Sequence, residues 1–123
     1  MKLKKEGIVF VSLADEDKEE AFPLVKALLD MGFSLATTGL TTKFMKEKGY
    51  ETIHLGKASE GSSAAVDFIK EGKPAYVVNT RAILSGVHYV DGALIRRAAI
   101  ESGYQPITSI DTLKALINVL KSE

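Results

Sequence analysis

Ile8-Val9-Phe10-Val11-Ser12 is the stretch that decides the fold, because it is an unbroken run of β-prone residues near the start of the chain. Such a run is typical of a strand buried on both faces, as in a parallel sheet covered by helices. The next segment, Asp15 to Met31, has apolar residues at helical spacing and is followed by Gly32, a residue favoured just after a helix. A strand followed by a helix in this way favours an α/β fold.

The same alternation continues to the end of the chain. Further strands are predicted at Phe33 to Thr37, Glu51 to Leu55, Ala75 to Asn79 and Ile107 to Ile110. Further helices are predicted at Thr41 to Lys48, Ser63 to Glu71, Asp91 to Ser102 and Thr112 to Leu120, the last capped by Asp111. We therefore expect one domain over residues 1–123, with a three-layer α/β/α Rossmann-like fold and a five-stranded, mainly parallel sheet. Right-handed crossovers would place the strand-to-helix loops at the carboxyl edge of the sheet, where such folds bind ligands.

Composition excludes several classes of function. The 123 residues include 16 basic and 16 acidic side chains, and a net charge of zero argues against nucleic-acid binding. The chain has no cysteine, which suits a reducing, cytoplasmic location and excludes cysteine-based metal sites and nucleophiles. No apolar run is long enough to span a membrane, and Met1 to Gly7 does not read as a signal peptide. His54 and His88 lie far apart without a third ligand, and dinucleotide and P-loop motifs are absent, so we expect neither metal nor cofactor.

Polar residues gather in the loops after the predicted strands. The loop Thr37-Thr38-Gly39-Leu40-Thr41-Thr42 places four hydroxyls at a helix start, which favours a bound phosphate or carboxylate over simple capping. Lys57, after the third strand, could bring a cation to the same anion, although a loop lysine is more commonly solvated. Asn79, Thr80 and Arg81 follow the fourth strand, where Asn79 could read a base or ribose edge and Arg81 could pair with phosphate.

Two arginines lie away from these loops, inside the predicted helix from Asp91 to Ser102. We interpret Arg96 and Arg97 as a solvated face or an interface pair. The residues alone thus predict an anion-binding α/β domain, and they leave open whether a reaction follows binding.

Short motifs occur in a characteristic order along the chain. They are Ser12 with Lys18 six residues on, Gly32-Phe33, the pair Thr38-x-x-Thr41, Lys57, Tyr76-Val77-Val78-Asn79-Thr80 and Ile95-Arg96-Arg97. Each is short, but their order and spacing together resemble the methylglyoxal-synthase-like domain family from about Gly7 to Leu120. Within that family the chain is most similar to the carboxyl-terminal allosteric domain of the large subunit of carbamoyl phosphate synthetase.

The resemblance implies five parallel strands with a pocket for a nucleotide monophosphate at their carboxyl edge. The effector in such domains is uridine monophosphate (UMP), an inhibitor, or inosine monophosphate (IMP), and urea-cycle versions bind N-acetylglutamate instead. The residues that the resemblance assigns to the pocket are Ser12, Lys18, Thr38, Thr41, Lys57, Asn79, Thr80 and Arg81. The phosphate would lie against Lys18, Thr38 and Thr41, with Lys57 near the ribose and phosphate. Arg81 departs from the small hydroxyl residue of some relatives and would allow an added phosphate contact.

The alternative within the family is methylglyoxal synthase, a lyase acting on dihydroxyacetone phosphate. Its chemistry needs a carboxylate base beside the substrate. The Gly-Gly-Asp that supplies the base reads Glu60-Gly61-Ser62 here, and the carboxylate of Glu60 starts two residues away. Its Trp-Asp-Pro reads Arg81-Ala82-Ile83, and His88 and Asp91 fall one residue off the enzyme's other His and Asp. We therefore expect no proton-abstracting acid beside the anion.

The partner expected from the resemblance is the remainder of the synthetase, covalently joined or separate. Effector binding would then regulate pyrimidine or arginine biosynthesis, and the domain in isolation would have no enzyme activity. A stand-alone small-anion sensor and a homo-oligomer remain open at this point. The inosine monophosphate cyclohydrolase domain, which shares the first two loops, is longer than this chain.

Overall fold

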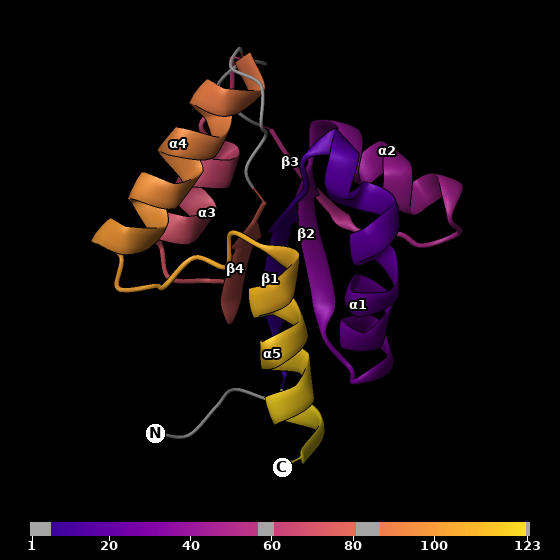
Figure 1. Ribbon diagram of the computed structural model, residues 1–123. Helices are drawn as coiled ribbons and strands as arrows, with labels where there is room; N and C mark the ends of the chain where they lie inside the picture. Colours follow the sequence, from indigo (N-terminus) through magenta and orange to yellow (C-terminus); the bar gives the residue numbers. More distant parts are fainter. Residues whose placement is uncertain (1–5, 57–60, 81–86, 123) are drawn as a thin grey trace.

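The strands form one parallel sheet in the computed structural model, which describes residues 6–56, 61–80 and 87–122, apart from the side chains of 87–91. They are β1 (Ile8–Ser12), β2 (Ser34–Thr38), β3 (Ile53–Leu55) and β4 (Tyr76–Asn79). Their order is β3-β2-β1-β4, and every neighbouring pair is parallel. All the carboxyl ends therefore lie at one edge of the sheet, the upper edge in Figure 1.

The helices follow the strands in the order that the apolar spacing predicts. A single turn of 3-10 helix, η1 (Asp15–Asp17), leads into α1 (Lys18–Asp30), and then come α2 (Gly39–Glu47), α3 (Ala64–Lys70), α4 (Val87–Glu101) and α5 (Ile110–Ser122). The predicted boundaries are correct to within a few residues at most ends. Among the described residues, no helix combines the length and the apolar character needed to cross a membrane.

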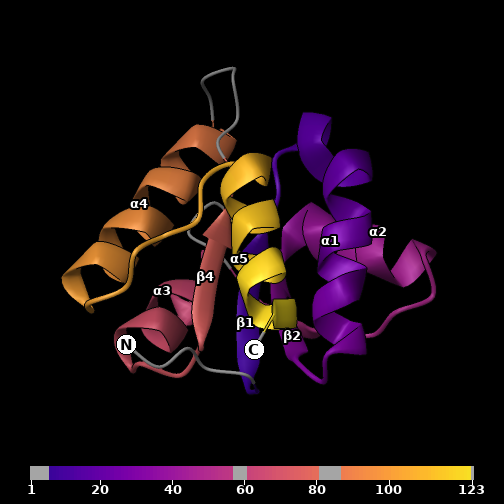
Figure 2. The ribbon, with the colours of Figure 1, turned by 60° about the horizontal axis from the view of Figure 1, so that its bottom comes forward.

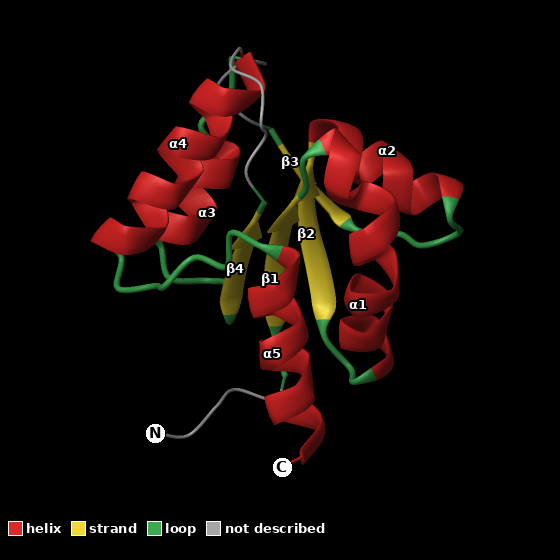
Figure 3. Cartoon of the chain, in the orientation of Figure 1, coloured by secondary structure: helices red, strands yellow, loops and turns green. Residues whose placement is uncertain are grey.

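The sheet is the middle of three layers (Figure 3). Helices α1, α2 and α5 cover one face, and α3 and α4 cover the other; α1 and α5 lie side by side in Figure 2. Alternation along each strand assigns the side chains to these faces. Val9 and Val11 join the core under α1 and α5, whereas Phe10 joins the core under α3 and α4. Because both faces are covered, β1 is apolar throughout its middle, as its sequence predicts.

The expected fifth strand, Ile107 to Ile110, does not form, and the described sheet has four strands. Ile107 alone makes a parallel bridge to Val78. Its N–H donates to the carbonyl of Val77 and its carbonyl accepts from the N–H of Asn79, both at 2.8 Å. Pro106 has no N–H to donate, and α5 begins at Ile110, so the segment between them is too short to extend the pairing.

The start of α5 also differs from the prediction that Asp111 caps it. The helix begins at Ile110, which places Asp111 inside the first turn. The hydroxyl oxygen of Ser109 accepts a hydrogen bond from the N–H of Thr112 at 3.2 Å, the geometry of an N-terminal cap. Ser109, not Asp111, is therefore the N-terminal cap of α5. The Asp111 carboxylate lies near the positive end of the helix dipole.

The strand order reverses beside β1. From β1 the chain builds β2 and then β3 outward on one side, and β4 returns to the other side of β1. In open parallel sheets, ligands bind at the carboxyl ends of the strands where the order reverses. The fold therefore points to the ends of β1 and β4, with β2 next to them.

Candidate functional site

The last residues of β2, β1 and β4 form a polar row across the carboxyl end of the sheet. Ser12 and Asn79 are register partners, and the Thr38 hydroxyl donates to the Ser12 hydroxyl oxygen at 3.1 Å. Alternation places Thr38, Ser12 and Asn79 on the α3 and α4 side, like Phe10 and Val77 two residues earlier in β1 and β4. Neighbouring strands are about 4.8 Å apart, so one small ligand can reach more than one member of the row.

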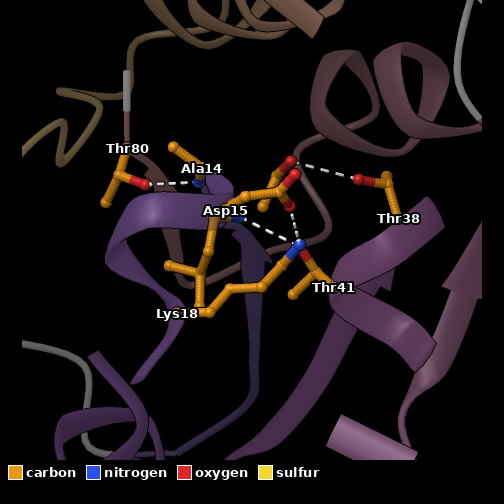
Figure 4. Close-up of polar contacts among 8 residues, drawn as sticks. Ala14, Asp15, Lys18, Thr38, Thr41 and Thr80 are labelled. Carbon is orange, nitrogen blue, oxygen red and sulfur yellow. Dashed lines mark hydrogen bonds and ion pairs between the residues drawn. The ribbon is translucent and has the colours of Figure 1, made fainter. Parts of the chain in front are cut away.

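The loop after β1 is fixed from two sides by threonine hydroxyls. The N–H of Leu13 donates to Thr41 Oγ1 at 3.0 Å, and the N–H of Ala14 donates to Thr80 Oγ1 at 2.8 Å. Figure 4 shows Thr41 and Thr80 on opposite sides of this loop. Loops that lie far apart in the sequence are thereby joined at one place.

These hydroxyls remain donors. An Oγ1 atom that accepts a backbone N–H still carries its own proton. Thr41 and Thr80 are 2% and 4% exposed and both accept in this way, and Ser12 accepts from Thr38. Hydroxyl protons at a parallel-sheet edge suit an anion, whose oxygens only accept hydrogen bonds.

The four threonines of the loop from Thr37 to Thr42 fall into two groups with different contacts. Thr37 and Thr42 bond each other at 2.7 Å, and Thr37 also bonds Thr52 at 2.6 Å, in a cluster that does not include Ser12. Thr38 precedes α2 but makes no side-chain capping bond, so the simple capping interpretation is wrong for this residue. Gly39 has φ of +44°, a left-handed value that lets the chain turn directly from β2 into α2. The first N–H groups of α2 therefore lie at the same edge as the hydroxyls.

Lys18 supplies the cation at this edge, and it is already paired. Its ammonium forms an ion pair with the Asp15 carboxylate (Figure 4). The Lys18 side chain is 11% exposed, whereas that of Asp15 is 66% exposed. Asp15 thus brings a carboxylate to this edge, where the sequence analysis assigned it no role; that it abstracts no proton stays a prediction. The three-residue spacing of Asp15 and Lys18 at a helix start was the signal that sequence analysis missed.

Arg96 reaches the edge from α4, so its interpretation as part of a solvated face is wrong. Its Nη1 donates to Asn79 Oδ1 at 2.6 Å, and Asn79 itself is 3% exposed. Arg97, by contrast, is exposed, and within the described part of the chain it makes a long ion pair at 3.4 Å with Glu101, as a solvated face would. Helical periodicity explains the difference, because adjacent residues on a helix point about 100° apart.

Ser12, Lys18, Thr38, Thr41, Asn79 and Thr80 therefore meet at one edge of the sheet. Lys57 and Arg81 lie outside the described residues, as does Glu60. Among the residues that the structure describes, no group of three or more His, Asp or Glu side chains could hold a metal ion.

Comparison with known proteins identifies the family of the chain. The model of the MGS-like domain family matches residues 20–105. The carbamoyl phosphate synthase large chain of Clostridium botulinum (strain Loch Maree / Type A3) is 39% identical over 124 residues, covering 100% of this chain. That of Synechocystis sp. (strain ATCC 27184 / PCC 6803 / Kazusa) is 39% identical over 118 residues, covering 94%. The chain spans only 12% and 11% of those two relatives.

Among solved structures, the crystal structure of ForH has the same fold. It aligns with a TM-score of 0.68 and 17% sequence identity, covering 95% of this chain and 80% of that one. At this identity the likeness concerns the fold alone.

Proposed function

This chain belongs to the MGS-like domain family, and we propose that it is the carboxyl-terminal allosteric domain of a carbamoyl phosphate synthase large chain. Its effector is a nucleotide monophosphate, UMP or IMP, bound at the carboxyl edge of the sheet. The rest of the synthase is its partner, in the cytoplasm. Family membership and similarity to the large chain over the whole length of the domain support this proposal.

The observation that carries the proposal is the gathering of donors at one edge. The donors are hydroxyl protons and one ammonium: Ser12 ends β1, Lys18 begins α1, Thr41 lies in the first turn of α2, and Thr80 follows β4. The amino end of α2 adds backbone N–H groups. Such an arrangement suits a phosphate, whose oxygens accept several charge-assisted hydrogen bonds at once.

Asp15 gives the site a simple exchange mechanism. In the structure its carboxylate holds the nearly buried ammonium of Lys18. An incoming phosphate offers Lys18 a more highly charged acceptor, and the exposed Asp15 can turn into solvent. Binding thus replaces one ion pair with another and leaves no buried charge without a partner. Lys57 and Arg81 are further proposed contacts, to the ribose and phosphate.

Calorimetric titration with UMP and IMP tests the proposal directly. We expect saturable binding that weakens roughly ten- to hundredfold in Lys18→Met, because a hydrogen bond to a charged group is lost. Methionine keeps much of the apolar stem that Lys18 buries. Lys26→Met is the matched control, because Lys26 lies in the same helix and makes an exposed ion pair with Asp30 at 3.3 Å. Equal affinities in the two variants, or no binding by the unaltered protein, would overturn the proposal.

The lyase remains a second candidate because a carboxylate, Asp15, does lie at the edge. Its pairing with Lys18 argues against a role as base. The ion pair stabilises the carboxylate form, so taking up a proton becomes less favourable. An assay with dihydroxyacetone phosphate should yield no methylglyoxal. A sustained rate that disappears in Asp15→Asn would transfer the proposal to the lyase.

Regulation requires that the effector bind more tightly to one state of the enzyme than to another. Typical coupling is about 1–3 kcal/mol, or roughly five- to 150-fold in affinity. Carbamoyl phosphate formation by the complete synthase should therefore change on addition of UMP or IMP, and Lys18→Met should abolish the response. Tight nucleotide binding without any change in synthase activity would indicate a stand-alone sensor.

A further inference from the structure

The contact between Arg96 and Asn79 fixes the orientation of an amide group. A guanidinium only donates hydrogen bonds, so the Asn79 atom 2.6 Å from Arg96 Nη1 must be the carbonyl oxygen. The NH2 group then occupies the opposite end of the same planar amide. Asn79 makes no other side-chain hydrogen bond within the described part of the chain. Its two NH2 protons are therefore available at the end of β4, beside Ser12.

Gly92 makes this contact sterically possible. A Cβ atom at position 92 would lie 2.8 Å from Arg96 Nη1 and 3.2 Å from Asn79 Oδ1. Both distances are shorter than ordinary van der Waals contacts, so a side chain there would displace the guanidinium. Glycine is unfavourable inside a helix, and α4 carries it one turn before Arg96. Gly92 thus lowers the local stability of α4 at the position where the Arg96 side chain lies over the helix.

We propose that Arg96 is a positioning residue for effector binding. By holding the oxygen of Asn79, it presents the NH2 group to the effector, so the site selects a hydrogen-bond acceptor at this position. The group recognised is a carbonyl or hydroxyl oxygen of the nucleoside part, on the opposite side of Ser12 from Thr38 in the row. This inference rests on the proposed nucleotide-binding function, and it states that in one contact the protein donates the hydrogen bond and the effector accepts it.

Gly92→Ala and Arg96→Gln test the inference, with UMP and inorganic phosphate as probes. Each variant should bind UMP about fivefold more weakly and phosphate within about twofold of the unaltered protein, because only the nucleoside part meets Asn79. Gly92→Ala should also keep or raise the midpoint of thermal unfolding, since alanine favours helix. Arg96→Lys, which keeps a donor, should recover part of the UMP affinity. Arg97→Gln, in the same helix, is the matched control and should change neither probe.

The ratio of the two affinities separates the possible outcomes. Unchanged UMP binding in both Gly92→Ala and Arg96→Gln would overturn the positioning role and leave the proposed function intact. Equal weakening of UMP and phosphate would also overturn it, because that is the result of general damage to the edge.

A measurement without ligand keeps the inference testable if UMP does not bind at all. The Asn79 side-chain NH2 signals in a 15N NMR spectrum should show a heteronuclear NOE close to that of rigid backbone. In Arg96→Gln this NOE should fall, and in Arg97→Gln it should not. An unchanged value in Arg96→Gln would show that Arg96 does not hold the amide, whatever the ligand is.

Discussion

At the scale of single residues, the hydroxyls that we propose bind the effector also hold the loops of the candidate site together. Thr41 Oγ1 satisfies the N–H of Leu13, and both residues are buried. Removing that oxygen would leave a buried donor without a partner, at a cost of about 1–3 kcal/mol. Loss of binding in a Thr41 variant would therefore mix two effects. Lys18 is a better probe, because its ion pair with Asp15 joins two side chains.

The ion pair between Lys18 and Asp15 leads to a prediction about affinity. Asp15→Asn should bind UMP about two- to fivefold more tightly, because the phosphate no longer competes with a carboxylate for Lys18. Asp15 is 66% exposed, so unfolding free energy should stay within about 0.5 kcal/mol of the unaltered protein. Titration calorimetry and urea unfolding measure the two quantities. Asp17→Asn removes the same charge from the same turn and is the control. An equal gain in UMP affinity in both variants would mean that net charge, and not the ion pair with Lys18, causes the effect.

At the scale of elements, α5 shows how the capping residue sets where a helix begins. The segment after Ile107 offers both Ser109 and Asp111 as caps, and both residue types are favoured there. Burial decides between them. Ile110 packs with Leu113 and Ile117 in the core under α1, and this requires Ile110 to be helical already. Ser109 is then the residue in the capping position.

This choice of cap predicts unequal costs of two alanine substitutions. Ser109→Ala should lower the free energy of unfolding by about 1 kcal/mol, because the Thr112 N–H loses its acceptor. Asp111→Ala should cost only a few tenths of a kcal/mol, the value of a carboxylate near a helix start. Urea denaturation of the two variants provides the comparison. The reverse order of costs would restore Asp111 as the cap.

At the scale of the whole molecule, hydrogen bonds near both ends of α4 connect the layer formed by α3 and α4 to the sheet. At the carboxyl edge, Arg96 joins α4 to the end of β4. Beyond the other end of α4, Tyr104 donates its hydroxyl proton to the carbonyl of Pro74 at 2.6 Å, just before β4. The first contact joins α4 itself to β4, and the second joins the segment after α4 to the residue pair before β4.

The Tyr104 contact gives the molecule a predicted response to alkaline pH. Burial raises the pKa of the Tyr104 hydroxyl above its ordinary value of 10.0. A pKa that is higher in the folded state contributes stability below pH 10.0, and this contribution is lost as pH rises through the folded-state pKa. Tyr104→Phe should cost about 1 kcal/mol at neutral pH, through the lost hydrogen bond. Urea unfolding from neutral pH to about pH 11 should show this difference shrinking; a constant difference would exclude the linkage.

Much of the fold follows from the sequence alone, because apolar spacing is a local property of the chain. The alternation of strands and helices, and the location of Thr38 and Asn79 where strands end, needed no tertiary information. The fifth strand failed because Ile107 has the residue type of a strand but lacks room for one between Pro106 and α5. The local pattern of apolar residues does not show how many residues remain free to pair with a neighbouring strand.

The partners of the polar side chains are fixed by tertiary contacts. The amino-acid sequence alone specifies the layers and the sheet edge at which we propose that a ligand binds, since burial patterns and parallel strands specify both. It did not determine that Asp15 holds Lys18, or that Arg96 folds over Gly92 to hold Asn79. Hydrogen bonds and ion pairs depend on distances of a few ångströms between segments far apart in the chain. Those distances exist only once the core has packed.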